Sequence, residues 1–473
     1  MKMIIGGREA GSGRTMEVRN PYDGSVLDTV PSATPDEVDA ALASAEKGAR
    51  TMAATSRFER GAILDRAAAA VERRSGELSR LLASEVGKTV REAQSEVSRA
   101  AQTLAASAAE ARRLGGEIVP FDAAPHGRDR FGFWIRVPVG VVVAVTPFNF
   151  PLNLAVHKVA PAIAAGNAVI LKPASATPLT DIVLGSILLE AGLPGEALSV
   201  VTGPGPGVGD ALVSHPLPRM VTFTGSADVG RAILARAGLK KTAMELGSNS
   251  AVIVTDRCDV ESAAGRCVRG AYAVAGQVCI SVQRVLVQRD VARRFLDAAV
   301  AGAESLRVGD QLLDGTDVGP MINEKEAARA ADWIAEASRL GARILSGGAR
   351  SGATVTPAVI ADPPEESRVW KDEAFAPLMC VRTYGTLDEA IACVNRSRYG
   401  LQAGVFTDRL EDALRAVHEI ECGGVMVNDV PSFRVDVMPY GGVKESGLGR
   451  EGPRFAVEEM SEIRVVSMRR EGP

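Results

Sequence analysis

The chain has 473 residues, with 46% apolar and 24% charged side chains, and its 54 basic and 58 acidic residues give a formal charge of −4. This composition is ordinary for a globular protein of two or three domains and argues against disorder. The balanced charge and an aromatic content of only 4% give no case for binding nucleic acid or an anionic membrane. The most apolar stretch, Val137–Phe148, is shorter than the roughly 20 residues of a membrane-spanning helix.

Six cysteines occur without any C-x-x-C pair, at positions 258, 267, 279, 380, 393 and 422. The four histidines are scattered, which excludes the usual zinc spacings and a dense disulfide framework. We therefore expect no metal site and a reducing compartment. Since the N-terminal residues form no apolar signal-peptide core, a cytoplasmic location is predicted.

The first 115 residues carry mainly helical patterns. Capping boxes, in which Ser or Thr is followed three positions later by Glu, begin at Thr34 and Ser56. An alanine-rich helical pattern then continues from Ser75 to Arg113. No obvious catalytic chemistry is found in this region, and we predict that it is mostly helical.

Strand and helix patterns alternate from about Arg130 onward. Strands are predicted at 131–137, 139–145, 168–171, 200–201 and 220–223, and helices at 151–165, 178–191, 208–214 and 228–237. A second alternating series extends from Ala251 to Asn428. This alternation predicts βαβ units, parallel sheets and an α/β fold of two interlocked domains.

Three polar residues stand where chemistry is plausible. Cys279 lies in a small, polar, Gly-rich segment that suits a nucleophilic thiolate, although an inert core cysteine is the alternative. Glu245 follows a strand-like run, where burial would raise its pKa toward that of a general base, unless it is a turn residue at the surface. The Asn149 amide can donate to an oxyanion or instead cap the helix that begins at Pro151.

Two further segments suit a nucleotide. Lys172 ends an apolar strand, and ligands of parallel sheets collect at the carboxyl ends of strands. Phe223–Gly230 forms a strand, a Gly-Ser turn and a helix start, whose free N–H groups suit a pyrophosphate. The Gly203–Gly209 cluster lacks the G-x-G-x-x-G fingerprint and is interpreted as a plain loop.

These segments, in this order, resemble the aldehyde dehydrogenase superfamily over essentially the whole chain. The matching motifs are Pro147–Pro151 (PFNFP), Leu171–Ser175 (LKPAS), Phe223–Ser226 (FTGS), Glu245–Gly247 (ELG), Gly276–Cys279 (GQVC), Glu373–Pro377 (EAFAP) and Pro439–Gly447 (PYGGVKESG). The nearest branch contains lactaldehyde, succinate-semialdehyde and phosphonoacetaldehyde dehydrogenases. The resemblance implies a modified Rossmann cofactor domain, an α/β catalytic domain and a small β oligomerisation element.

The resemblance also assigns roles and boundaries. Cys279 is the implied nucleophile, Asn149 the oxyanion donor and Glu245 the general base. Implied contacts with NAD or NADP come from Thr146, Pro147, Phe148, Lys172, Ser175, Gly225, Ser226, Leu246, Gly247, Glu373 and Phe375. The implied cofactor domain comprises 1–119 and 139–247, the catalytic domain is mainly 248–462, and the oligomerisation element comprises 120–138 and 463–473. A homodimer or homotetramer is expected.

The implied reaction oxidises an aldehyde to its acid through a thiohemiacetal and a thioester on Cys279. Two alternatives remain open, a CoA-acylating dehydrogenase and a catalytically silent structural member of the fold. Relatives that acylate CoA commonly lack the glutamate found here at 245, which favours hydrolysis.

The expected substrate is a short polar aldehyde. By the resemblance, Asn153 and His157 lie on one helical face at the substrate tunnel, and Arg434 lies in the loop at its mouth. His157 and Arg434 are candidates to hold an anionic or hydroxylated tail. Alternatively, Arg434 pairs with Asp436 at the surface and His157 is a hydrogen-bonded wall residue. Ser175 stands where NAD-preferring relatives often carry an acidic residue, so both NAD and NADP are expected to be accepted.

Overall fold

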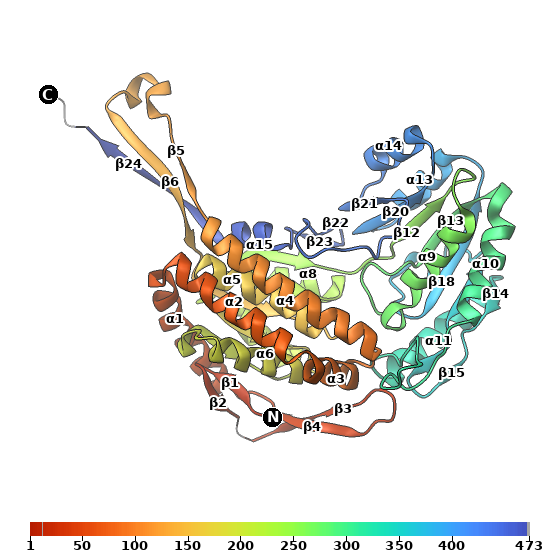
Figure 1. Ribbon diagram of the computed structural model, residues 1–473, viewed down its shortest axis with the longest axis horizontal. Helices are drawn as coiled ribbons and strands as arrows, with labels where there is room; N and C mark the ends of the chain where they lie inside the picture. The colour runs from red at the N-terminus through yellow and green to blue at the C-terminus, as the bar shows by residue number, and fades with distance from the viewer. Residues whose placement is uncertain (12, 471–473) are drawn as a thin grey trace.

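The computed structural model describes residues 1–11 and 13–470 and builds the chain around two large sheets (Figure 1). The first sheet has the strand order β2-β1-β9-β8-β7-β10-β11-β23. Neighbouring strands from β9 to β11 in that order pair in parallel. These strands are β1 (Met3–Ile5), β2 (Arg8–Ala10), β7 (Val141–Val145), β8 (Ala168–Lys172), β9 (Leu198–Val200), β10 (Met220–Thr224), β11 (Lys241–Glu245) and β23 (Gly447–Leu448).

Helices pack around this first sheet. The helix α5 is buried along its whole length, so its polar residues face other protein groups rather than bulk water. It packs against the long helix α4 and against strands β7 and β8. The helices of this part are α1 (Pro35–Ala54), α2 (Arg57–Arg73), α3 (Ser75–Val86), α4 (Val90–Arg113), α5 (Pro151–Ala165), α6 (Leu179–Glu190), α7 (Asp210–Ser214), α8 (Ala227–Ala237) and α15 (Pro453–Glu459).

The second sheet has seven strands in the order β14-β17-β18-β13-β12-β20-β21, all pairing in parallel except β14. Its strands are β12 (Ala251–Val254), β13 (Arg284–Gln288), β14 (Arg343–Ser346), β17 (Ala358–Ala361), β18 (Leu378–Tyr384), β20 (Gln402–Phe406) and β21 (Gly424–Val427). Its helices are α9 (Val260–Tyr272), α10 (Ala292–Glu304), α11 (Glu324–Arg339), α12 (Arg368–Lys371), α13 (Leu387–Asn395) and α14 (Leu410–Glu419).

Each large sheet with its helices forms one body of the molecule. Among the described residues, three two-stranded sheets accompany the two bodies. They pair β3 (Thr15–Arg19) with β4 (Val26–Pro31), β15 (Arg350–Ser351) with β16 (Thr354–Val355), and β19 (Tyr399–Gly400) with β22 (Val443–Lys444). Shortly after β22, the chain returns to the first sheet as β23, which pairs with the end of β11. The C-terminal segment therefore links the two sheets.

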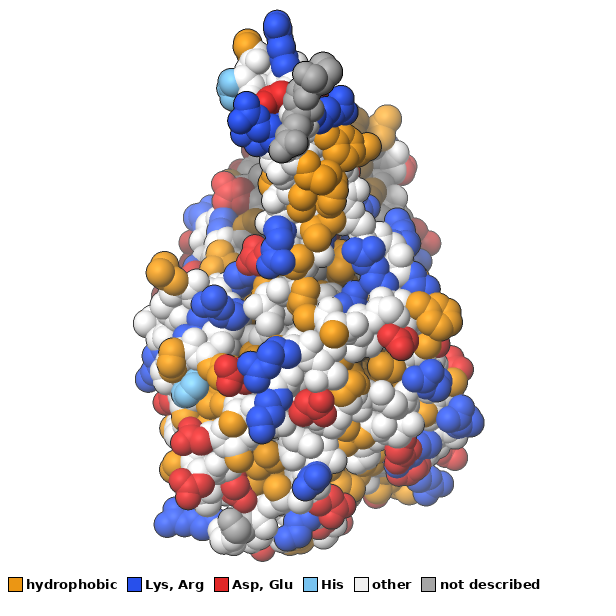
Figure 2. Space-filling model, turned by 90° about the vertical axis from the view of Figure 1, so that its left-hand side faces the viewer, with side chains coloured by type: hydrophobic (Ala, Val, Ile, Leu, Met, Phe, Trp, Pro, Cys, Tyr) orange, Lys and Arg blue, Asp and Glu red, His pale blue; other side chains and the backbone are white. Residues whose placement is uncertain are grey.

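A three-stranded arm projects from the molecule (Figure 1). It consists of β5 (Gly116–Ile118), β6 (Arg130–Pro138) and β24 (Ser461–Arg469), with β24 at one free edge. The exposed large apolar side chains of its strands are Ile118, Phe131, Ile463, Val465 and Met468. Figure 2 shows apolar side chains gathered along the arm. An open strand edge with apolar side chains favours pairing with another chain. Residues 471–473 of the predicted oligomerisation element lie outside the described residues.

The predicted α/β fold class is confirmed, and the strand and helix series from residue 130 onward closely matches the prediction. The capping boxes at Thr34 and Ser56 are both formed. The prediction missed strands β1 to β4, which are short and partly exposed and therefore lack a clear apolar alternation. It also joined α3 and α4, which are separated because Gly87 ends α3 with a left-handed φ of 86°.

The domain boundaries themselves stay a prediction. In the described part of the chain, none of the helices combines the length and the apolar character that a membrane crossing requires.

Candidate active site

Four of the predicted site segments follow parallel strands of the first sheet. Thr146 follows β7, Lys172 ends β8, Gly225 follows β10 and Glu245 ends β11. From β7 the chain adds β8 and β9 on one side, whereas β10 and β11 lie on the other side of β7. Ligands of open α/β sheets bind at such a switch point in strand order, beside the carboxyl ends of the strands. The sheet thus brings the predicted cofactor segments to one edge.

Lys172 is a buried cation at this edge. Its Nζ donates to the Pro173 carbonyl at 2.8 Å, and it forms no salt bridge within the described residues. Burial lowers the pKa of Lys172 to about 8. Nearby, Ser175 is exposed and its hydroxyl donates to the Gly203 carbonyl at 3.1 Å. A buried lysine with no salt-bridge partner can accommodate an added negative charge, such as a phosphate.

The start of α8 lies at the same edge. Gly225 N–H donates to the Glu245 carbonyl at 3.0 Å, which ties the turn to β11. Ser226 is the N-cap of α8, and its hydroxyl accepts from the Val229 N–H at 3.4 Å. A side chain at Gly230 would collide with Leu246, so the helix and the residue after β11 pack closely. The remaining free N–H groups of the helix start suit a phosphate.

Glu373 reaches this region from the second body. Its carboxylate accepts from the Ser248 N–H at 2.9 Å, and burial raises its pKa to about 7. A Cβ at Gly247 would lie 2.2 Å from a carboxylate oxygen of Glu373, so a side chain there would displace this carboxylate. Phe148 and Phe375 meet edge to face at 5.7 Å between ring centroids. Residues from both bodies therefore converge at one place.

Cys279 lies in a tightly held loop after α9. Val274 and Ala275 adopt left-handed φ angles of 51° and 52°, which are costly for residues with a Cβ. The Val274 N–H donates to Glu92 at 2.7 Å and fixes this bend. Cys279 is half-buried, and burial raises the pKa of its thiol to about 11. The loop holds the thiol in a defined place but keeps it protonated near neutral pH.

Asn149 contacts the same loop. Its Nδ2 donates to the Gln277 carbonyl at 2.8 Å, two residues before Cys279. Phe150, not Asn149, is the N-cap of α5, and no side chain caps that helix. The helix-cap alternative is therefore wrong, and the amide points to the cysteine loop, as an oxyanion donor should.

Glu245 is buried, and one of its carboxylate oxygens, Oε2, has no hydrogen-bond partner in the described part of the chain. Burial raises the pKa of Glu245 well above its usual range, and the negative charge of Glu451 adds to this effect. A carboxyl with a raised pKa gains a proton readily near neutral pH, which is the property of a general base. The alternative of an exposed turn glutamate is wrong.

The predicted substrate residues form one buried network. His157 Nε2 lies 2.9 Å from Asp436 and 3.1 Å from Arg434. Asn153 donates to Asp436 at 3.0 Å, while Arg434 pairs with Glu451 at 3.0 Å. The surface pair of Arg434 with Asp436, which the sequence left open, is therefore wrong. Burial lowers the pKa of His157, so its ring is neutral near pH 7.

Sequence reasoning missed four members of this region. Arg99 holds Asp436 through two hydrogen bonds of 3.0 and 2.8 Å, and Lys158 pairs with Glu451 at 2.9 Å. Lys158 was detectable, because a lysine within an apolar helix pattern requires a buried partner. The sequence does not indicate that Arg99 and Glu451 belong to the site, because nothing in it shows that they approach α5.

Tyr440 is the fourth missed residue. Its hydroxyl lies 2.9 Å from the Cys279 sulfur, and the Arg434 guanidinium lies 3.7 Å from the centre of its ring. It belongs to the matched motif Pro439–Gly447, but the motif alone does not show what it touches. The structure therefore connects the predicted tail residue Arg434 to the predicted nucleophile through one tyrosine.

We expect Tyr440→Phe to raise the pKa of the Cys279 thiol, because the hydroxyl then no longer donates to the thiolate. A hydrogen bond to a charged group contributes about 1.5–3 kcal/mol, or roughly one to two pKa units. The pH profile of iodoacetamide alkylation should move upward by about one unit or more. An unmoved profile would show that the contact does not stabilise the thiolate. Tyr399→Phe serves as a control, since Tyr399 contacts Arg398 instead.

The chain is similar to known proteins over nearly its whole length. The aldehyde dehydrogenase family model matches residues 8–466. The chain is 45% identical to 3-sulfolactaldehyde dehydrogenase of Priestia aryabhattai over 464 residues, covering 98% of this chain and 97% of the relative.

Two solved structures are similar over nearly the full length. The first is aldehyde dehydrogenase 21 from Physcomitrella patens in complex with the reaction product succinate, with a TM-score of 0.97, 38% identity and coverage of 100% and 98% of the two chains. The second is glyceraldehyde-3-phosphate dehydrogenase GapN from Methanocaldococcus jannaschii complexed with NADP, with a TM-score of 0.93, 37% identity and coverage of 96% and 99%. The resemblance drawn from the motifs is confirmed, and the chain belongs to the aldehyde dehydrogenase family of NAD(P)-dependent oxidoreductases.

Proposed function

We propose that this protein oxidises a short aldehyde with an anionic tail to its carboxylic acid, with NAD or NADP as hydride acceptor. The observation that supports an anionic tail on the substrate is a surplus of positive charge beside Cys279. Three cations, Arg99, Lys158 and Arg434, face two ionised carboxylates, Glu451 and Asp436. The raised pKa of the nearby Glu245 favours its neutral form, so the resting network keeps one surplus positive charge. An anionic tail would compensate this charge.

The pKa values of the network support this count. Burial alone would raise the pKa of Glu451, but Lys158 and Arg434 lower it to about 2. Hydrogen bonds from His157 and Arg99 likewise hold the pKa of Asp436 well below its usual range, against the effect of burial. Both acids are therefore ionised at neutral pH, while His157 is neutral.

The residues at the sheet edge fit the dinucleotide. Lys172 supplies a buried cation for the adenosine ribose or its phosphate, and the start of α8 supplies N–H groups for the pyrophosphate. The Glu373 carboxylate, which lies against Gly247, suits the hydroxyls of the nicotinamide ribose. When bound, the nicotinamide supplies hydride acceptance, which no protein side chain provides.

In the proposed mechanism, the Cys279 thiolate attacks the aldehyde carbon. The resulting alkoxide accepts hydrogen bonds from the Asn149 amide and the Cys279 backbone N–H, and one such donor is worth about 2.7–4 kcal/mol. Loss of hydride leaves a thioester on Cys279. Glu245 then takes a proton from a water, which attacks the thioester and releases the acid. Tyr440 and Arg434 stabilise the thiolate before attack.

The substrate class is tested with a panel of aldehydes against wild type, His157→Ala and Arg434→Ala. We expect carboxy-, phosphono- or sulfo-substituted C2–C4 aldehydes to give the highest kcat/KM. Loss of Arg434 should raise their KM by about tenfold or more, as expected for one charged hydrogen bond. KM for an uncharged short aldehyde is the matched control and should change little. A preference for long aliphatic or aromatic aldehydes would contradict the proposal.

For the cofactor, we expect both NAD and NADP to be accepted. In the protein without cofactor, burial lowers the pKa of Lys172 to about 8, and a bound 2′-phosphate would favour the charged form of this side chain. Binding of NADP therefore takes up a proton above pH 8, so KM for NADP should rise from pH 7 to 9 while KM for NAD stays nearly constant. Initial rates at both pH values check this. A preference for NAD above about a thousandfold, roughly 4 kcal/mol, would contradict it.

Three further proposals complete this function. Hydrolysis rather than transfer to CoA completes the reaction, because Glu245 is present, buried and has a raised pKa.

The free β24 edge and the apolar side chains of the arm support assembly into a homodimer or homotetramer. The cysteines form no disulfide within the described residues, which is consistent with the predicted cytoplasmic location.

A further inference from the structure

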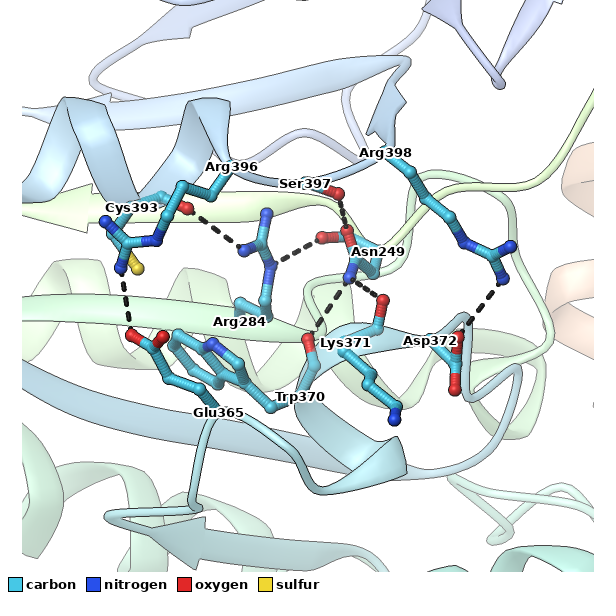
Figure 3. Close-up of a pocket in the computed structure, with 10 residues that line it drawn as sticks. All are labelled: Asn249, Arg284, Glu365, Trp370, Lys371, Asp372, Cys393, Arg396, Ser397 and Arg398. Atoms are coloured by element: carbon cyan, nitrogen blue, oxygen red, sulfur yellow. Dashed lines mark hydrogen bonds and ion pairs between the residues drawn. The ribbon is translucent and has the colours of Figure 1, made fainter.

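A separate cavity of about 420 Å³ lies at the amino ends of β12 and β13. None of the proposed catalytic residues lines it. Four cationic side chains do, namely Arg284, Lys371, Arg396 and Arg398 (Figure 3). Its volume falls in the range of roughly 300–1,000 Å³ that is typical of small-molecule sites.

Arg284 is a buried cation in the cavity wall, with only 4% of its surface exposed. Its Nε donates to the Asn249 carbonyl at 3.0 Å and its Nη1 to the Cys393 carbonyl at 3.4 Å. Nη2 forms no hydrogen bond to any described residue, and Figure 3 shows this third nitrogen without a partner. No carboxylate of the described residues pairs with Arg284, and burial lowers its pKa to about 10. A buried cation without a counterion is costly.

The acids of the cavity are already engaged. Glu365 pairs with Arg396 at 2.9 Å and with Arg382 at 3.0 Å, and Asp372 pairs with Arg398 at 3.1 Å. Within the lining itself, four cations face these two acids, which leaves two surplus positive charges. Arg398 also pairs with Glu445, which lies outside the lining, at 3.3 Å. The surplus lies on Arg284 and on the exposed Lys371, which forms no ion pair in the described part of the chain.

Trp370 restricts what the cavity can recognise. Arg284 and Arg382 lie 5.5 and 5.1 Å from its ring centre, and only 4% of the residue is exposed. The ring is therefore unavailable for stacking on a nucleotide base. Recognition must come from charge and from guanidinium hydrogen bonds, which suit the oxygens of a dianion.

We propose that this cavity binds a phosphate group, with Arg284 Nη2 at its base and Arg396 at its rim. The exposed Lys371 side chain, which Figure 3 draws pointing away from Arg284, turns toward the bound phosphate. Two surplus positive charges match the charge of a phosphate dianion, and guanidinium groups match its geometry. The remaining volume accommodates the small organic part of a phosphate ester. The site is independent of the proposed reaction, and its test is a binding measurement.

The test is calorimetric titration of the full chain with inorganic phosphate and with glycerol phosphate, at constant ionic strength. Acetate and chloride are the monoanion controls. Substitution of buried Arg284 would disturb the carbonyls that it holds, so the variant is Lys371→Ala/Arg396→Ala at the exposed rim. Lys325→Ala/Arg293→Ala removes the same charge elsewhere on the surface, and Lys172→Ala reports on binding at the cofactor edge.

We expect saturable binding of phosphate by the wild type, at least tenfold weaker binding at this cavity in the rim variant, and unchanged binding by Lys325→Ala/Arg293→Ala. Lys172→Ala should keep this binding and lose only any second phosphate bound at the cofactor edge. Tighter binding of the ester identifies a phosphorylated metabolite as the ligand, and tighter binding of inorganic phosphate identifies the free ion. The proposal is overturned if the wild type shows no saturable binding, if the rim variant binds as the wild type does, or if Lys172→Ala abolishes binding. Equal binding of acetate also overturns it.

Discussion

Replacing Cys279 with Ala is expected to lower dehydrogenase kcat by roughly 10⁴-fold or more, because the covalent path then has no nucleophile. The burial and contacts of this thiol fit the role of nucleophile. It is half-buried, and it lies beside the Tyr440 hydroxyl in a loop that the Asn149 amide contacts. Steady-state production of NADH or NADPH from a short polar aldehyde measures the effect.

The other five cysteines provide matched controls. Cys422 is the sharpest of them, since it is also partly exposed, but its sulfur donates to the Gly424 carbonyl, at 3.0 Å, rather than lying beside the Tyr440 hydroxyl. We expect Cys422→Ala to keep nearly full activity. Thermal unfolding of both variants should shift little, which separates a loss of chemistry from a loss of fold. Comparable activity in Cys279→Ala and wild type would remove Cys279 from the mechanism.

The second large effect is expected for Glu245→Gln. This variant keeps the shape of the side chain but removes the base that activates water, and general-base catalysis typically contributes about 10²–10⁴-fold. Hydride transfer precedes hydrolysis, so one equivalent of NADH or NADPH should form in a burst before turnover stalls. Stopped-flow absorbance of the reduced nicotinamide resolves the two phases.

A missing burst would show that Glu245 also takes the proton from the thiol. The raised pKa of the Cys279 thiol, about 11, makes this outcome chemically reasonable, because a thiol that is protonated at neutral pH requires an acceptor. Glu451→Gln is a poor control, since it breaks two ion pairs. Glu458→Gln, on the exposed side of α15, is the better control and should turn over normally.

Much of this architecture follows from local patterns. The buried parallel strands and the helix caps each depend on residues close in sequence, which is why they were predictable. Strands β1 to β4 were missed, because short, half-exposed strands take their stability from neighbours that are distant along the chain.

The candidate site was likewise predictable only in part from the sequence. The strand ends that bring Thr146, Lys172, Gly225 and Glu245 to one edge follow from the rule for parallel sheets. The partner of Arg434 did not follow, because Glu451 arrives from the segment before α15 and its approach to α5 depends on the whole fold. The contact between Tyr440 and Cys279 is likewise set by tertiary packing.

The most direct test of the account is mass spectrometry of Glu245→Gln after it reacts with a short anionic aldehyde and NAD or NADP. We predict that the peptide containing Cys279 gains the mass of the acyl group, in an amount equal to the burst of reduced cofactor. Hydroxylamine should release this adduct, as it does thioesters. An acyl group on another residue, or a full burst without any adduct on Cys279, would contradict the account.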